Sequence, residues 1–191
     1  MLILVRHGRT ALNAEHKLQG RIDQPLDEVG QRQAVEIAKV LTDIDRVISS
    51  PLMRARQTAA ALGKPVEIDQ RFVELDYGSF DGLLDSDVPG EIWRKLRSDK
   101  NYRPPNGETL AELDLRVRQA INELVEDART KNIVVVSHVS PIKSMIAWSL
   151  GSDVGVSWRM LLDHASISRI AITDLGPVMR GFNDTSHLTE I

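Results

Sequence analysis

Hydrophobic residues along the chain occur either in short unbroken runs or at helical spacing. Leu2–Val5 and Ile133–Val136 are apolar throughout, which is typical of strands covered on both faces. Shorter runs predict four further strands, at Arg46–Ser49, Val66–Ile68, Ser168–Thr173 and Val178–Phe182. The last two are expected to join at Gly176-Pro177.

Segments with helical periodicity lie between these runs. The predicted helices are Asp27–Ile44, Leu52–Leu62, Glu91–Arg97, Thr109–Arg129 and a helix that Pro141 opens and Gly151 ends. Thr109 and Glu112 have the spacing of a capping box. Pro51 is expected in the first turn of the second helix. Strands that alternate with helices indicate an α/β sheet covered on both faces.

The length of 191 residues fits one domain spanning 1–191. Residues 78–107 fit the alternating pattern less well, because prolines and charges interrupt them. A long excursion of this kind is often a functional flap, although it can also be a simple insertion.

Composition narrows the function. The chain has 42% hydrophobic residues and a net charge of −3 from 24 basic and 27 acidic residues, which argues against nucleic-acid and anionic-membrane partners and favours a small anionic ligand. It has no cysteine, so disulfides and thiolate chemistry are excluded. The apolar run at the start is too short for a signal peptide, and no run approaches membrane-spanning length, so a cytoplasmic location is expected.

Each of the two most apolar strands ends in a histidine, His7 in "ILVRHG" and His138 in "IVVVSH". Ligands of open α/β sheets bind outside the carboxyl ends of the strands, at a switch point of the strand order. If the two strands are neighbours, the imidazoles converge there. A nucleophile, a metal ligand and a structural strand-end histidine are the three interpretations.

Arginines and a glutamate occur at similar positions. Arg6 precedes the first histidine, Arg54 follows a strand in "SSPLMRARQTA", and Glu74 stands before a glycine-containing turn. Two arginines would repel a divalent metal, whereas guanidinium groups bind phosphoryl oxygens in bidentate fashion. The set therefore suits covalent phosphoryl transfer, with a carboxyl group to protonate the leaving alkoxide.

Six stretches in order carry a resemblance to a known family: "VRHGRTALN", "QGRIDQPLDEVGQRQA", "SSPLMRARQTA", "ELDYGSFDG", "PPNGET" and "VVSHVSP". Together they resemble the histidine phosphatase superfamily, which includes cofactor-dependent phosphoglycerate mutases and many small phosphatases. The resemblance implies a three-layer α/β/α sandwich with a mainly parallel central sheet, of the phosphoglycerate mutase-like type.

The resemblance also implies roles for the candidate residues. His7 would be the nucleophile, Arg6 and Arg54 would clamp the phosphoryl oxygens, and His138 would hydrogen-bond the same group. Glu74 would act as acid to the leaving group and then as base to water.

Further residues would surround the phosphate. Asn13 would lie at its edge, and Gln19 and Gly20 would line the substrate side. Val139 departs from the family, because many members have glycine after the second histidine. A β-branched residue resists a positive φ, but its N–H can still point at the phosphate if φ is negative.

The resemblance implies a phosphatase for a small phosphomonoester, without cofactor or metal, and a homodimer is a further expectation. A phosphoglycerate mutase is also compatible, although the basic residues expected of a second phosphate clamp are interspersed with acidic ones. Three more functions stay open: a protein phosphohistidine phosphatase, a non-catalytic phospholigand-binding module and a metal-dependent hydrolase. His16, His164 and His187 are expected to need no special role.

Overall fold

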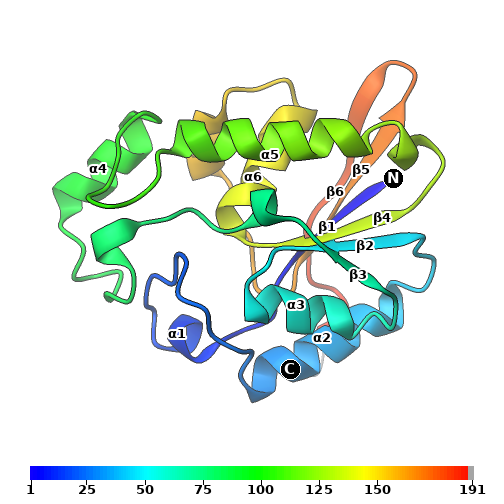
Figure 1. Ribbon diagram of the computed structural model, residues 1–191, viewed down its shortest axis with the longest axis horizontal. Helices are drawn as coiled ribbons and strands as arrows, with labels where there is room; N and C mark the ends of the chain where they lie inside the picture. The colour runs from blue at the N-terminus through cyan, green and yellow to red at the C-terminus, as the bar shows by residue number, and fades with distance from the viewer. Residues whose placement is uncertain (189–191) are drawn as a thin grey trace.

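In the computed structural model, which describes residues 1–188, six strands form one sheet in the order β3-β2-β4-β1-β5-β6 (Figure 1). The strands are β1 Leu2–Arg6, β2 Arg46–Ser49, β3 Val66–Ile68, β4 Ile133–Ser137, β5 Ile167–Thr173 and β6 Gly176–Asp184. The pairs β3–β2, β2–β4 and β4–β1 are parallel, and β5 pairs antiparallel with both β1 and β6. The mainly parallel sheet is thus confirmed.

Helices cover both faces of this sheet, which confirms the three-layer fold. The helices are α1 Ala11–Ala14, α2 Glu28–Val40, α3 Met53–Ala60, α4 Gly90–Ser98, α5 Leu110–Leu124 and α6 Val139–Ser149. Short 3-10 turns are η1 Gln70–Phe72, η2 Gly78–Phe80, η3 Asp127–Arg129 and η4 Val154–Arg159. In Figure 1, α5 and α6 lie above the sheet, α2 and α3 below it, and α4 and α1 at the left.

The unbroken apolar runs are explained by the two hydrophobic cores that the sheet separates. Side chains alternate across a strand, so Leu2 and Leu4 enter the core under α5 and α6, while Ile3 and Val5 enter the core over α2 and α3. The side chains of β4 alternate in the same way between the two cores. Both central strands are therefore apolar up to their last residue, and polar groups occur only at their ends.

Helix α5 begins as its sequence predicts and ends earlier. Thr109 caps the helix and forms the expected capping box with Glu112. The α-helix stops at Leu124, and Ala128 is buried from the separate 3-10 turn η3. The prediction of one continuous helix to Arg129 is wrong, because this 3-10 turn also keeps the apolar residue on the buried side.

The positions of two prolines and the end of one helix differ from the prediction. Helix α3 begins at Met53, so Pro51 precedes it, whereas α6 begins at Val139, so Pro141 stands at its third position. The first-turn N–H groups have no partner within the helix, so proline is tolerated there as well as at the first position. Helix α2 ends at Val40 instead of Ile44, and Leu41 is its C-cap residue.

The final hairpin turns two residues earlier than predicted. Strand β6 begins at Gly176, so the turn consists of Asp174 and Leu175, and Pro177 lies in the strand. Because β6 is at the edge of the sheet, a residue without an N–H is tolerated there.

Residues 78–107 consist of η2, α4 and connecting loops. An isolated bridge joins Lys17 to Leu84, and the edge of the Trp93 ring meets Trp158 of η4 at 6.3 Å between centroids. That this segment acts as a flap stays a prediction. Within residues 1–188, no helix is both long enough and apolar enough to cross a membrane.

Candidate active site

The two strand-end histidines lie side by side, because β1 and β4 are parallel neighbours. Arg6 pairs in register with Ser137, and each is the last residue of its strand. The residue that follows each strand is therefore a histidine at the same edge of the sheet. The rings of His7 and His138 are 5.0 Å apart between centroids and are tilted by 59°. The structure thus brings together the two residues that the sequence placed 131 positions apart.

Arg54 connects the two imidazoles. Its Nε lies 3.3 Å from Nε2 of His7 and 3.2 Å from Nδ1 of His138, and donates toward both. Its terminal nitrogens donate to the carbonyl oxygens of Ile22, at 2.7 Å, and Gly20, at 2.8 Å. The side chain is 1% exposed, so this guanidinium is held rigidly at the bottom of the site, whereas Arg56, two positions further along α3, is exposed.

The protonation of His7 follows from its partners. Its Nδ1 lies 2.7 Å from the carbonyl oxygen of Gly8. A carbonyl only accepts, so Nδ1 carries the hydrogen and Nε2 keeps its lone pair. Burial, followed by the positive charges of Arg54 and Arg6, holds the pKa of His7 well below its usual range. His7 is therefore a neutral imidazole at neutral pH, with Nε2 directed toward Arg54.

His138 is buried completely and is oriented by a residue that the sequence analysis missed. Its Nε2 lies 2.7 Å from Oγ of Ser50, the residue directly after β2. Burial and the charge of Arg54 lower the pKa of His138 as well. Because Nδ1 accepts from Arg54, Nε2 carries the hydrogen and donates to Ser50. The end of a third strand was the signal that could have identified this serine.

Arg6 contributes the second buried cation. One terminal nitrogen donates to the carbonyl oxygen of Leu162 at 2.6 Å, and within residues 1–188 its Nε has no hydrogen-bond partner. Burial lowers the pKa of Arg6 to about 10, against the opposing effect of Glu74, and burial likewise lowers the pKa of Arg54 to about 10. Both side chains remain cationic at neutral pH.

Glu74 is fixed against the start of α6. It is 7% exposed, and its Oε1 accepts hydrogen bonds from the backbone N–H groups of Leu75, at 2.7 Å, and Ser140, at 3.2 Å. Ser140 is the second residue of α6, where backbone N–H groups have no partner within the helix. The carboxyl group is therefore held at the wall of the site by two donors.

The loop after β1 supplies a polar rim. Asn13 Oδ1 accepts from the backbone N–H of Thr10 at 3.2 Å, and the side-chain amide nitrogen of Gln19 donates to the Thr10 hydroxyl. Gly20 has a φ of +47° and offers its carbonyl to Arg54. Capping and side-chain hydrogen bonds thus fold this segment over the edge of the sheet.

These groups surround a cavity of about 210 Å³, which we call the catalytic cavity. Its walls contain eight of the nine residues singled out from the sequence: Arg6, His7, Asn13, Gln19, Gly20, Arg54, Glu74 and Val139. The ninth, His138, is buried beneath them against Arg54. The other residues that line the cavity are Lys17, Leu18, Tyr77 and Asp85. They lie in loops whose course the sequence pattern does not reveal.

Two backbone positions explain why particular residues stand there. A Cβ added to Gly8 would lie 2.5 Å from the carbonyl oxygen of Gly30, so the loop behind His7 can pack against α2 only without a side chain. Val139 is the first residue of α6 and does not have a positive φ. Its β-branched side chain is therefore compatible with the helix start at the cavity.

His164 is one of the three histidines that were expected to need no special role, and it lies close to Arg6. His164 precedes β5, and its Nε2 is buried without a hydrogen-bond partner in residues 1–188. Burial and the charge of Arg6 lower the pKa of His164 to about 3. It is a third neutral, buried imidazole behind the arginine of β1.

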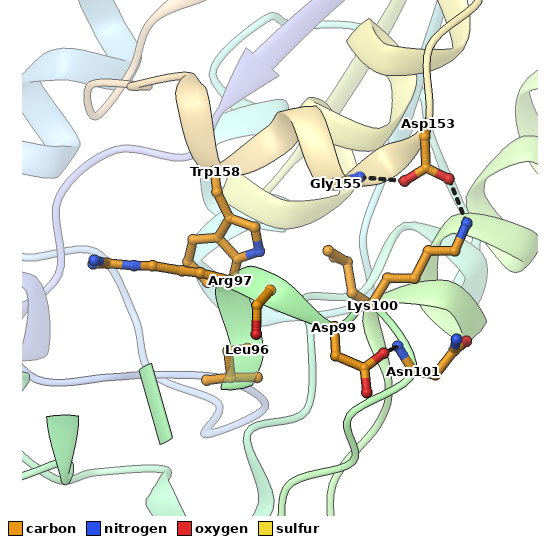
Figure 2. Close-up of a pocket in the computed structure, with 10 residues that line it drawn as sticks. Leu96, Arg97, Asp99, Lys100, Asn101, Asp153, Gly155 and Trp158 are labelled. Carbon is orange, nitrogen blue, oxygen red and sulfur yellow. Dashed lines mark hydrogen bonds and ion pairs between the residues drawn. The ribbon is translucent and has the colours of Figure 1, made fainter. Parts of the chain in front are cut away.

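A second cavity, of about 310 Å³, lies between α4, the start of α5 and η4 (Figure 2). Trp158 and Arg97 stand on one side, and Lys100 reaches across to Asp153 on the other. The cavity lacks paired imidazoles and a buried arginine, so it does not share the chemistry of the catalytic cavity.

The mainly parallel sheet, the paired histidines at its edge and the buried arginine between them define a phosphoglycerate mutase-like α/β protein with a site for a small anion. The model of the histidine phosphatase superfamily (branch 1) matches residues 2–185, and the chain belongs to this family.

Several relatives extend this comparison. The chain is 36% identical over 177 residues to a bifunctional protein of Mycobacterium tuberculosis; the match covers 87% of this chain, which spans about half (49%) of that relative. It is 33% identical to phosphoserine phosphatase 1 of Hydrogenobacter thermophilus, over 99% of this chain and 94% of the relative. A crystal structure of phosphoserine phosphatase from Entamoeba histolytica, in complex with 3-phosphoglyceric acid, superimposes with a TM-score of 0.90 at 30% identity, covering 98% of each chain.

Proposed function

We propose that this protein hydrolyses small phosphomonoesters through a phosphohistidine intermediate on His7. The observation that carries the proposal is the lone pair on Nε2 of a neutral, buried His7, 3.3 Å from the Nε of Arg54. A phosphoryl group at this point would receive the nucleophile from one side and the guanidinium charge from the other.

The first step forms a nitrogen–phosphorus bond. Nε2 of His7 attacks phosphorus, the bond between phosphorus and the ester oxygen breaks, and Glu74 gives its proton to the departing oxygen. In the second step Glu74 takes a proton from a water molecule, which attacks the phosphohistidine. The nitrogen–phosphorus bond then breaks and inorganic phosphate leaves, so that His7 is regenerated.

The surrounding groups act on the charge of the phosphoryl oxygens. Arg6 and Arg54 bind these oxygens, and burial strengthens the attraction because little water screens it. When a bound phosphoryl group takes up the hydrogen bond from Nε of Arg54, Nδ1 of His138 loses that donor. The hydroxyl of Ser50 can then donate to Nε2, which would place the hydrogen of His138 on Nδ1, toward the phosphoryl group. Asn13, Gln19, Gly20 and the N-terminus of α6 at Val139 complete the binding surface.

The positions of the basic residues around α4 favour a phosphatase over a mutase. Lys100 pairs with Asp153 and Arg103 pairs with Glu112, while Arg97 lies over the rings of Trp93 and Trp158. In the described part of the chain, no basic residue from 83–106 lines the catalytic cavity. A second phosphate clamp would need such residues.

The related phosphoserine phosphatases support a small phosphorylated metabolite as substrate, and the E. histolytica enzyme is seen with a phosphorylated hydroxy acid bound. A protein phosphohistidine substrate is less compatible with a catalytic cavity of about 210 Å³. The cytoplasmic location, the homodimer and the lack of a nucleic-acid partner stay predictions.

Turnover of p-nitrophenyl phosphate tests the proposal. We expect His7→Ala to abolish turnover and wild-type protein to trap labelled phosphate that survives base and is lost in acid, with Arg56→Ala as an exposed control on the same helix as Arg54. Full activity in the His7→Ala variant, or loss of activity with a chelator, would end the proposal. A pure binding module would show no turnover and would not depend on Glu74.

A further inference from the structure

A small cavity adjoins the catalytic cavity on the α6 side. Its volume is about 30 Å³, and Tyr77 and Val139 line both cavities. We call it the side cavity. A space of this size takes one or two water-sized groups, which is the size of a carboxylate and too small for a phosphoryl group with its four oxygens.

Lys143 lines the side cavity from α6. It follows Val139 by four residues and Ser140 by three, so all three share one face of the helix. Side chains on a helix lean toward its N-terminus, which here is the catalytic end. The ammonium group is therefore directed along the wall that also carries the hydrogen bond from Ser140 to Glu74.

The charge of Lys143 lacks a partner. Four of the other lysines form close ion pairs, namely Lys17 with Glu15, Lys39 with Glu36, Lys100 with Asp153 and Lys131 with Asp127. Lys64 and Lys95 form none within residues 1–188, but both are exposed to solvent. Half-buried Lys143 has no ion pair or hydrogen bond within residues 1–188, although Glu74 is near enough to raise its pKa against the larger lowering effect of burial. A partly desolvated ammonium without a counter-ion favours an anion beside it.

Trp158 forms part of the wall of the side cavity. Its indole Nε1 is buried without a hydrogen-bond acceptor in the described chain. The same ring forms a wall of the larger cavity in Figure 2, so it separates the two spaces. Lys100, beyond this ring, is already paired with Asp153.

We propose that Lys143 is a specificity-determining residue that binds a carboxylate of the substrate in the side cavity. The substrate class is then a phosphomonoester of a small hydroxy acid. The inference rests on the proposed function, because it takes the phosphoryl group to be bound at His7. It goes further by assigning this chain's own residue to the leaving group.

Two probes isolate the carboxylate. 3-Phosphoglycerate and glycerol 3-phosphate share the phosphate and the carbon chain, and differ only in a carboxylate against a hydroxymethyl group. We expect the wild-type protein to prefer 3-phosphoglycerate, and Lys143→Met to lower its kcat/KM by about 10- to 100-fold, since a charged hydrogen bond contributes about that factor. The values for glycerol 3-phosphate and p-nitrophenyl phosphate should stay within about threefold, because neither carries the carboxylate.

Matched variants sharpen the test. Lys143→Arg keeps the charge and should restore part of the preference, whereas Lys100→Met removes a nearby, paired charge and should leave the preference unchanged. An equal loss for all three substrates in Lys143→Met would overturn the inference, because the lysine would then act on the phosphate or on Glu74. The absence of any wild-type preference for 3-phosphoglycerate would overturn it as well.

Binding separates this inference from the proposed function. Isothermal titration of the His7→Ala variant with both probes measures the contribution of Lys143 without turnover, when compared with the His7→Ala, Lys143→Met double variant. Selective binding of 3-phosphoglycerate that needs Lys143, in a wild-type protein that does not hydrolyse phosphomonoesters, would refute the phosphatase and support the carboxylate site. Hydrolysis of phosphomonoesters without a preference that depends on Lys143 would support the phosphatase and refute the carboxylate site.

Discussion

Acidification should destabilise this protein strongly, because it holds three imidazoles in and beside the site in their neutral form. Burial is the largest cause of the lowered pKa of His7, His138 and His164. In the unfolded chain each histidine titrates with a pKa of about 6.5. Below that pH the unfolded state binds protons that the folded state does not, so the free energy of unfolding decreases as the pH falls.

The magnitude follows from the unfolded-state pKa, as long as the folded imidazoles stay neutral. Between about pH 7.5 and pH 5.5, each histidine then costs about 1.4 kcal/mol, and the three together about 4 kcal/mol.

Two carboxylates oppose this change, because burial raises the pKa of both Asp81 and Asp85. Burial raises the pKa of Asp81 to about 6. Its protonation in the folded state therefore stabilises the protein as the pH falls, by at most about 0.8 kcal/mol and by less after solvent screening. The histidines dominate, and we expect a net loss of about 3 kcal/mol between the two pH values.

Urea unfolding followed by circular dichroism measures this loss at the two pH values. His164→Asn should lower the pH dependence by about 1.4 kcal/mol, since it removes one of the three groups. The exposed His16→Asn is the matched control and should leave the pH dependence nearly unchanged. A loss below about 1 kcal/mol in the wild-type protein would refute the reasoning, because the imidazoles would then be protonated in the folded state.

Three further predictions concern the site and its support. Arg54→Lys should lower kcat/KM for p-nitrophenyl phosphate by about 100-fold, because lysine cannot contact both imidazoles and both loop carbonyls; an activity near that of the wild type would contradict the bridging role. Ser50→Ala should lower kcat by about tenfold with little change in KM, since His138 loses the group that orients it, and Ser50→Thr should recover part of the rate. Gly8→Ala should lower the free energy of unfolding in urea by about 1–3 kcal/mol, because the new methyl group meets the backbone of Gly30, whereas the control Gly90→Ala meets no atom within 4 Å, has no positive φ and reports the loss of glycine's backbone freedom alone.

The sequence by itself determined the layers of the fold and the principal site residues. Runs such as Leu2–Val5 can be apolar at every position only between two cores, so the covered sheet was readable from the pattern. His7 and His138 were readable for the same reason, because each follows such a run. The order of the motifs identified the family, and with it the expected roles of Arg54 and Glu74, which their positions at a strand end and before a turn had already singled out.

Only the tertiary structure decided how these groups meet. Ser50 orients His138 because β2 and β4 are parallel neighbours, and strand order is a long-range property that periodicity does not encode. Helix ends also depended on packing, since a 3-10 turn and an α-helix can bury the same residue, as at Ala128. Lys143 is one lysine among several in the sequence, and only its partial burial beside the catalytic cavity, without an ion pair in residues 1–188, distinguishes it from the others.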